Sequence, residues 1–462
     1  MLPNHSPWIA QLNRTRPVVP LEEDLLADVV IVGGGIAGVM TAYFTLRDTN
    51  RSVLLVEGDK VAHGATGHNA GQLVSYFERS FTSLVDDFGL TLASEGAHAV
   101  ESAWTLLDEA VEGAKLTTPI HRFTGYAGVC LAEQLIEHLE DNRLRVEGGL
   151  SAKRIVVAVE WGGVSSIPSK YSGLYETSTH GDILTALETN TQKYIAMIAE
   201  DKGVANSALL AEEVAGYLLY TYPERFRLHE ETLVSQVRLH DGRGALIANG
   251  HAISAANVVL ATNGFENLTI TNDDGPDINA EFHHDVQGLV GYMAGYVEEG
   301  AAPPTAISYY GKSAEVRSDD PMGDDYFYLT RRPFEQEGAG AQNLICIGGP
   351  DKELPELKAY VRSDTCDEKY GDEISEFLVA DYKRYPGRET PYLYCWHGLM
   401  GYTRNRVRLV GREPLNSVLH YNLGCNGVGL LPSIMGSRRI AQLLNGETLS
   451  PSMFDPALRG GE

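Results

Sequence analysis

The apolar positions near the N-terminus form one continuous run whose first part is typical of a strand and whose second part is typical of a helix. Residues 28–33 (DVVIVG) are rich in β-branched residues, as expected for a strand that is buried on both faces. Residues 35–47 continue as an apolar helix, and residues 52–57 (SVLLVE) form the next predicted strand. The uncharged run 29–46 is long enough to be counted as a membrane span. We reject that interpretation because three consecutive glycines mark a switch from strand to helix.

The rest of the chain alternates between helical and strand patterns. Buried strands of the same character lie near both ends of the chain, with mixed β segments between them. The pattern therefore predicts an α/β fold, α+β over the whole chain, in which one parallel-sheet domain is assembled from separated pieces and a second sheet domain is inserted. The predicted helices are 83–113, 180–200, most of the acidic stretch 351–385, and 432–444. The predicted strands are 121–130, 153–160, 214–221, 234–240, 244–248, 258–261, 286–297, 326–330 and 343–348.

Composition narrows the class of protein. The chain has 37 Lys and Arg against 62 Asp and Glu, a net charge of −25, which disfavours binding to nucleic acid or to an anionic membrane. Its five cysteines are scattered and none forms a CxxC pair, so we expect neither a disulfide framework nor a metal site. The first twenty residues lack the apolar core of a secretory signal. These features predict a cytoplasmic globular protein.

A dinucleotide-binding fingerprint spans the first strand, turn and helix. Gly33-x-Gly35-x-x-Gly38 follows the strand and opens the helix, and Glu57 ends the next strand. Glycines allow the tight turn and the close approach of a pyrophosphate to the helix N-terminus, and the acid accepts hydrogen bonds from ribose hydroxyls. An acid here disfavours the 2′-phosphate of NADP.

Two further segments favour FAD over NAD. The loop 64–72 (GATGHNAGQ) is built of small residues that let backbone amides lie against a cofactor. Near the C-terminus the glycine turn 424–429 leads into a second helix, with Pro432 near its first turn. The positive end of that helix would stabilise the negative charge of a reduced flavin.

The motifs GGGIAG, GATGHNAGQ, VVLATNG, YFYLTRRP, WHGLMGYTRNRVRLVG and GCNGVGL occur in this order along nearly the whole chain. This set resembles the FAD-dependent oxidoreductases related to D-amino-acid oxidase, glycine oxidase and sarcosine oxidase, and most of all the gamma-glutamylputrescine oxidoreductases. The resemblance implies a discontinuous Rossmann-like FAD-binding domain (28–115, 176–265 and 391–462) preceded by an arm (1–27). It also implies a substrate domain (116–175 and 266–390) built on a mixed, largely antiparallel sheet.

The motifs and the resemblance together predict a set of FAD-binding residues. They are Gly33, Gly35, Ile36, Ala37, Gly38, Glu57, Gly64, Ala65, Thr66, His68, Asn69, Gly71, Gln72, Val234, Thr262, Gly398, Gly427, Val428, Gly429 and Leu430. His68 has two interpretations. It resembles the histidine that attaches FAD covalently through its 8α position in dimethylglycine- and sarcosine-dehydrogenase-like relatives, or it is a polar loop residue beside a noncovalent cofactor.

The candidate catalytic residues are His397 and Tyr402, which we expect at the edge of the flavin. Tyr326, Tyr328 and Trp396 are candidates for an aromatic cage around an amine. Amino-acid oxidases of this superfamily carry an arginine for the substrate carboxylate where this chain has Met400 and Gly401. Three other arginines could replace it, although surface or interdomain ion pairs are the more ordinary role: Arg331, Arg404 and Arg406.

The departure at Met400 moves the expected substrate from an amino acid to an amine. The resemblance implies oxidation of a C–N bond in a small amine, a secondary amine or N-substituted polyamine, by hydride transfer to flavin N5. Hydrolysis of the imine follows, and oxygen or another electron acceptor reoxidises the flavin. One alternative is an oxidase or dehydrogenase of D-amino acids, glycine or sarcosine. Another is a non-catalytic FAD-binding subunit of a larger complex.

Overall fold

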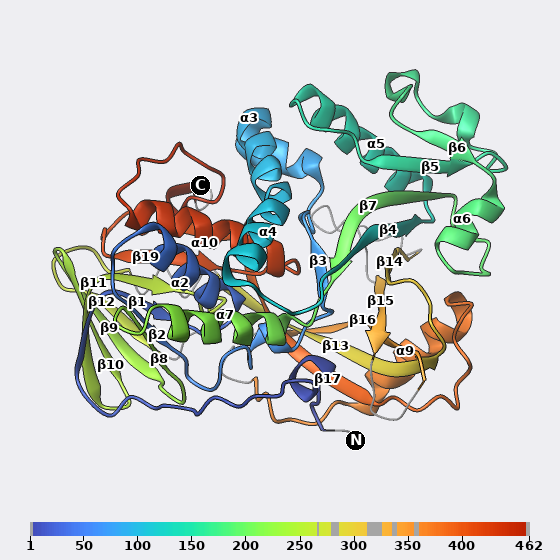
Figure 1. Cartoon of the computed structure of the whole chain (residues 1–462). Coiled ribbons are helices and arrows are strands. Elements are labelled where there is room, and N and C mark those ends of the chain that lie inside the picture. Colours follow the sequence, from blue (N-terminus) through green and yellow to red (C-terminus); the bar gives the residue numbers. More distant parts are fainter. Residues whose placement is uncertain are drawn as a thin grey trace.

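Two sheets dominate the computed structural model, which describes residues 3–265, 268–278, 286–311, 326–334, 340–354 and 360–458. In Figure 1 the first sheet lies beside the helices α2, α7 and α10, and the second lies beside α9. The helices are α1 (Pro7–Ala10), α2 (Ile36–Asp48), α3 (Phe81–Glu101), α4 (Ala103–Ala114), α5 (Ala132–Glu147), α6 (His180–Ala186), α7 (Ser207–Thr221), α9 (Glu368–Asp381) and α10 (Leu430–Leu444).

The first sheet has nine strands among the described residues, and its central strands are parallel. Their order is β8-β2-β1-β11, with β19 on the other side of β11, while β9 and β10 extend the sheet in antiparallel pairing. The strands are β1 (Leu25–Val32), β2 (Val53–Val56), β8 (Phe226–His229), β9 (Val234–His240), β10 (Arg243–Ala248), β11 (His251–Leu260), β12 (Thr269–Asn272), β18 (Leu409–Arg412) and β19 (Leu419–Leu423).

Successive side chains of β1 point to opposite faces of the sheet and so join two different cores. Val29 and Ile31 join the core that contains the buried faces of α2, α7 and α10, whereas Val30 and Val32 join a second core with β9 and β10. Both faces of β1 are therefore covered, which accounts for its continuous apolar sequence. Residues 33–35 connect the carboxyl end of β1 to the N-terminus of α2.

The second sheet has ten strands among the described residues and is mixed but largely antiparallel. Parallel pairing occurs only between β14 and β4 and between β5 and β6 in the described part of this sheet. The strands are β3 (Gln72–Val74), β4 (His121–Val129), β5 (Arg154–Ala158), β6 (Glu176–Ser178), β7 (Ala196–Val204), β13 (Val286–Glu299), β14 (Thr305–Tyr309), β15 (Phe327–Phe334), β16 (Gln342–Leu354) and β17 (Tyr394–Thr403). The predicted fold class is confirmed.

Two predicted elements were wrong. The segment 214–221, predicted as a strand, is the end of α7, whose start is capped by the Asn206 side chain accepting from Ala208 N at 3.1 Å and Leu209 N at 3.0 Å. The predicted helix 180–200 stops at Ala186, and its last five residues, 196–200, belong to β7, which pairs with β4 and β5. In both places tertiary pairing or capping outweighs the local propensity of the sequence.

Sheet pairing mixes the predicted pieces of the chain. β7 and β17, from pieces that we assigned to FAD binding, belong to the ten-stranded sheet, and β12 belongs to the nine-stranded sheet. The exact domain boundaries remain a prediction. In the acidic stretch 351–385 the described part contains the end of β16 and the helix α9, while residues 355–359 lie outside the described residues.

Candidate functional site

The turn between β1 and α2 has the geometry that the glycine fingerprint requires. Gly33 has φ +108°, and a Cβ there would lie 2.6 Å from the Ala261 carbonyl oxygen. A Cβ on Gly38 would lie 1.8 Å from the Gly33 carbonyl oxygen, so only glycine lets the helix approach the turn this closely. Gly35 is the capping residue of α2, Ile36 N donates to Thr66 Oγ1 at 2.9 Å, and Gly35, Ile36 and Ala37 line the cavity. The positive end of α2 therefore faces the site where a pyrophosphate would bind.

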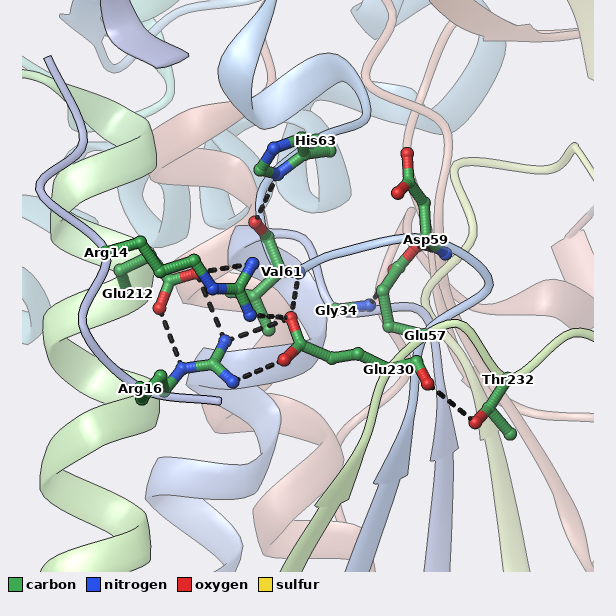
Figure 2. Close-up of polar contacts among 10 residues, drawn as sticks. All are labelled: Arg14, Arg16, Gly34, Glu57, Asp59, Val61, His63, Glu212, Glu230 and Thr232. Carbon is green, nitrogen blue, oxygen red and sulfur yellow. Dashed lines mark hydrogen bonds and ion pairs between the residues drawn. The ribbon is translucent and has the colours of Figure 1, made fainter. Parts of the chain in front are cut away.

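Glu57 lies directly after β2, beside this turn. Its carboxylate accepts hydrogen bonds from Gly34 N at 2.6 Å and from Asp59 N at 2.9 Å (Figure 2). Burial raises the pKa of Glu57, and the bond from Gly34 opposes this effect. The two backbone bonds hold the carboxylate in one orientation, with lone pairs left for ribose hydroxyls.

The loop that carries His68 contains a short 3₁₀ turn, Ala65–Gly67. Nδ1 of His68 lies 3.0 Å from the Gly64 carbonyl oxygen. Because a carbonyl only accepts, Nδ1 carries the hydrogen and Nε2 keeps its lone pair. Burial lowers the pKa of His68 to about 4, so the ring is neutral near pH 7. The loop is braced by Asn69, whose side-chain amide donates to Thr66 O at 2.7 Å.

The N-terminal arm supports this loop from behind. Ser6 Oγ donates to Gly67 O, and the fully buried Trp8 donates from Nε1 to Asn69 O at 2.5 Å. The Trp8 ring occupies the space where a Cβ on Gly71 would lie, 2.4 Å away. The Trp8 indole therefore leaves no room for a side chain at position 71. A larger residue there would displace the loop.

Farther along the arm, two arginines bind the same two acids, one of them buried. Arg14 and Arg16 both form ion pairs with Glu230, whose side chain is 1% exposed, and with Glu212 on α7. Glu230 also accepts from Val61 N at 2.7 Å, at the start of the His68 loop. Figure 2 shows both guanidinium groups pointing at these carboxylates beside the segment that carries Glu57.

The C-terminal glycine turn gives the site a second helix N-terminus. Residues 424–429 precede α10, whose capping residue Gly429 makes no side-chain hydrogen bond. Arg408 holds the turn by donating to Gly424 O at 3.1 Å and to Asn422 Oδ1 at 2.6 Å. Gly427 has φ +74°, and a Cβ there would lie 1.9 Å from the carboxyl carbon of Glu78. The Glu78 carboxylate is therefore packed directly against this turn.

These segments surround one cavity of about 1790 Å³. Ligand sites are typically about 300–1,000 Å³, so the space suits a cofactor and a substrate together. Predicted residues that line it are Gly33, Gly35, Ile36, Ala37, Glu57, Gly64, Ala65, Thr66, His68, Asn69, Gln72, Val234, Thr262, Gly398, Gly427, Val428, Gly429, Leu430 and Tyr402. Gly38 and Gly71 are not among the lining residues and act instead through the close packing described above.

The two candidate catalytic residues, Tyr402 and His397, differ in whether they line the cavity. Tyr402 lines the cavity and donates its hydroxyl to Glu78 Oε2 at 2.7 Å. His397 is not among the described lining residues, and its ring nitrogens lie 3.1 Å from the Tyr360 hydroxyl and from Asp364 O. Four residues of β17 line the cavity: Gly398, Met400, Tyr402 and Thr403. His397 does not share the alternation of the first three, and its ring packs instead against Tyr292 and Tyr360.

The other candidates divide in the same way. Tyr326 and Tyr328 line the cavity, but Trp396 is fully buried outside it and donates to Asn69 O at 3.3 Å. Arg331 is 2.6 Å from Glu188 and does not line the cavity, whereas Arg404 and Arg406 do.

Sequence reasoning missed Tyr76 and Glu78, which also line the cavity. The signal was present. Alternate residues from Gln72 onward (Gln72, Val74, Tyr76 and Glu78) all line the cavity, so the period of strand β3 continues beyond its end.

The described residues contain neither a candidate metal site nor a candidate membrane-spanning helix. Among the described residues, no group of three or more His, Cys, Asp or Glu side chains could hold a metal ion. In the same part of the chain, no helix combines the length and apolar character needed to cross a membrane.

Comparisons with known proteins identify proteins that resemble this chain in sequence or in fold. Over 86 residues the chain is 32% identical to gamma-glutamylputrescine oxidoreductase of Escherichia coli (strain K12), which is 19% of this chain and only 20% of that relative. Glycine oxidase from Geobacillus kaustophilus shares the fold with a TM-score of 0.66 and 15% identity, over 93% of this chain and 98% of that one. L-proline dehydrogenase from P. horikoshii also has a TM-score of 0.66, at 16% identity, over 94% of this chain and 98% of that one.

The sequence profile of one family extends over the whole site. It is described as FAD dependent oxidoreductase (DAO) and matches residues 28–443, from the strand before the first glycine turn to the helix after the last. The glycine cradle, the acid after β2 and the two helix N-termini suit an FAD molecule. The chain therefore belongs to the DAO family of FAD-dependent oxidoreductases.

Proposed function

We propose that this protein oxidises a C–N bond in a small amine, a secondary amine or an N-substituted polyamine, with FAD as the electron acceptor. One observation carries the proposal. The strand that faces the cavity presents Gly398, Met400 and Tyr402, and Tyr402 is hydrogen-bonded to Glu78 at 2.7 Å. A carboxylate at this wall attracts an amine and repels the carboxylate of an amino acid.

The bound FAD supplies a two-electron acceptor for the C–H bond next to the substrate nitrogen. The protein holds the substrate and shields it from water by the side chains that line the cavity, among them Met400, Tyr402, Tyr326 and Tyr328. Hydride loss needs a reacting nitrogen that is neutral and keeps its lone pair. The oxidised product, an imine, hydrolyses in water, and oxygen or another acceptor completes the cycle.

The test is anaerobic addition of a panel of amines to the purified yellow protein, followed by flavin absorbance. We expect N-alkyl amines to bleach the flavin band. Turnover of α-amino acids without turnover of any N-alkyl amine would overturn the proposal. No bleaching by either class would favour a non-catalytic FAD-binding subunit.

A second candidate is an amino-acid oxidase or dehydrogenase, and one observation favours it. Arg404 and Arg406 line the cavity, and the Arg406 guanidinium lies 5.7 Å from the centre of the Tyr402 ring. Either guanidinium could bind a substrate carboxylate. Glycine, sarcosine, proline and D-alanine in the same panel distinguish this candidate from the first.

His68 keeps both of its interpretations. Its neutral ring and the lone pair on Nε2 suit covalent attachment to the 8α position of the flavin, and its place on the cavity wall also suits a simple polar contact. Acid precipitation separates them, because covalently bound flavin stays in the protein pellet and noncovalent flavin passes into the supernatant.

A further inference from the structure

Glu78 stands at a wall shared by two cavities. It lines the large cavity with Tyr76 and Tyr326, and the same three residues also line a smaller cavity of about 80 Å³ behind it. Its carboxylate accepts from Tyr402 at 2.7 Å and packs against Gly427. The N-terminus of α10, which begins three residues after Gly427, favours a negative charge at this point.

Tyr402 contacts this carboxylate, and three further tyrosines lie close enough for its charge to act on them. Tyr76, Tyr326, Tyr328 and Tyr402 all line the large cavity and are half-buried. The Tyr326 and Tyr328 rings lie 5.6 Å apart. Burial raises the pKa of each of the four phenols, and the nearby charge of Glu78 raises it further. All four therefore stay neutral and present aromatic faces near the Glu78 carboxylate.

A carboxylate among aromatic faces recognises an organic cation. Ring faces attract ammonium groups through their quadrupole, and the carboxylate adds a charge-assisted bond. The tyrosine faces already accept cations of the protein: Lys202 Nζ lies 5.7 Å from the centre of the Tyr76 ring, and Arg406 lies 5.7 Å from that of Tyr402. Lys153 Nζ lies 5.2 Å from the centre of the same Tyr76 ring and forms an ion pair with Glu200.

We propose that Glu78 and the tyrosines Tyr76, Tyr326, Tyr328 and Tyr402 form a binding site for a second, non-reacting ammonium group of the substrate. The reason for assigning them the non-reacting nitrogen is chemical. A carboxylate stabilises the protonated form of an amine, whereas the nitrogen next to the oxidised carbon must be neutral. This inference rests on the proposed amine oxidation and names its substrate class: a diamine or polyamine that keeps one nitrogen charged.

The binding test uses choline and its neutral isostere, in which carbon replaces the quaternary nitrogen. A quaternary nitrogen has no lone pair to assist hydride loss from the carbon beside it, and a flavin band that choline shifts without bleaching shows that its alcohol is not oxidised either. Calorimetry and the shift of the flavin absorbance under anaerobic conditions measure its dissociation constant. Glu78→Gln should weaken choline binding about 10- to 100-fold, because the variant loses the Coulomb attraction of a carboxylate for the quaternary nitrogen in a partly desolvated site. It should leave the isostere and the FAD content unchanged.

Glu373→Gln is the matched control, because Glu373 also lines the cavity but belongs to α9. We expect choline to bind this variant as it binds the wild type. If Glu78→Gln fails to retain FAD, Tyr402→Phe replaces it, because it removes the phenol that orients the carboxylate and should weaken choline binding several-fold. Equal choline binding by the wild type and the Glu78 variant would overturn the inference.

Steady-state assays separate this inference from the proposed function. A diamine and a monoamine of equal chain length are compared through the ratio of their kcat/KM values. We expect Glu78→Gln to abolish the preference for the diamine mainly through KM. Failure of every amine to reduce the flavin would end the proposed function and leave the choline result standing. Oxidation of both amines with an unchanged ratio in the variant would end this inference alone.

Discussion

Replacing Arg14 and Arg16 together by methionine should destabilise the FAD-loaded protein strongly. Both guanidinium groups are bonded to Glu230, whose side chain is 1% exposed, and the arginine side chains themselves are 13% and 17% exposed. Removing the partners of a buried charge costs about 3–5 kcal/mol. Water reaches the arginines in part, and methionine keeps their packing, so we expect a loss of about 3 kcal/mol of unfolding free energy.

The assay is urea unfolding followed by tryptophan fluorescence and by the fluorescence of released flavin. Because Glu230 also accepts from Val61 N, we expect flavin release to move to lower urea together with unfolding. Adding Glu230→Gln to the double variant removes the unpaired charge and should recover part of the loss. Arg154→Met is the control, since the side chains of the Arg154–Glu176 pair are 59% and 62% exposed and such pairs contribute about 0.5 kcal/mol.

The pH dependence gives an independent check. Burial alone raises the pKa of Glu230, but the bonds from Arg16 and Arg14 outweigh it and leave this pKa lowered. A lowered carboxyl pKa contributes stability above the unfolded pKa, and this stability is lost as pH falls through the folded pKa. The wild type should therefore lose more stability on acidification than the double variant. A double variant that unfolds at the wild-type urea concentration, or is not improved by Glu230→Gln, refutes the reasoning.

Three further predictions concern the core of the site and of the sheet. Gly38→Ala should abolish FAD retention, measured by the ratio of flavin to protein absorbance, because its Cβ would lie 1.8 Å from the Gly33 carbonyl oxygen. Gly398→Ala should displace the His68 loop, since its Cβ would lie 2.2 Å from the His68 carbonyl oxygen, and should raise the FAD dissociation constant without unfolding the sheet. Burial lowers the pKa of His420 to about 4 from the ordinary 6.5, so the unfolded chain binds the extra proton between these pH values. Stability should fall by about 3 kcal/mol as pH drops through that window, and His420→Asn should remove that part of the slope in urea titrations.

The parts of the site that follow from local sequence were predictable. The turn at Gly33 and the acid at Glu57 depend on a strand, a helix and a short spacing, and the structure places both on one cavity. His397 shows the limit. A position on a motif does not reveal which face of the strand it occupies, and this depends on the register of β17 against β13. The segment 214–221 shows a second limit, because its aromatic and apolar residues suit a strand or a buried helix equally well.

The partners of Glu78 could not be predicted by spacing at all. Glu78 meets Tyr402 and Gly427 across more than three hundred residues of chain, and no local periodicity relates them. The contacts of the N-terminal arm with the His68 loop and with α7 could not be predicted for the same reason. Trp8 and Arg16 have no partner nearby in sequence, and their contacts appear only when α7 and the His68 loop are in place.

The strand order of the nine-stranded sheet also determines when its parts can fold during synthesis. β1 pairs with β2 and with β11, more than two hundred residues later, and β11 pairs in turn with β19 at residues 419–423. Contacts between such distant segments make folding slow. Synthesis proceeds at about 5–20 residues per second, so the first glycine turn leaves the ribosome well before its neighbours exist. We therefore expect FAD to bind late in folding, because a truncated chain that keeps the N-terminal fingerprint lacks the second glycine turn, residues 424–429, of the same cavity.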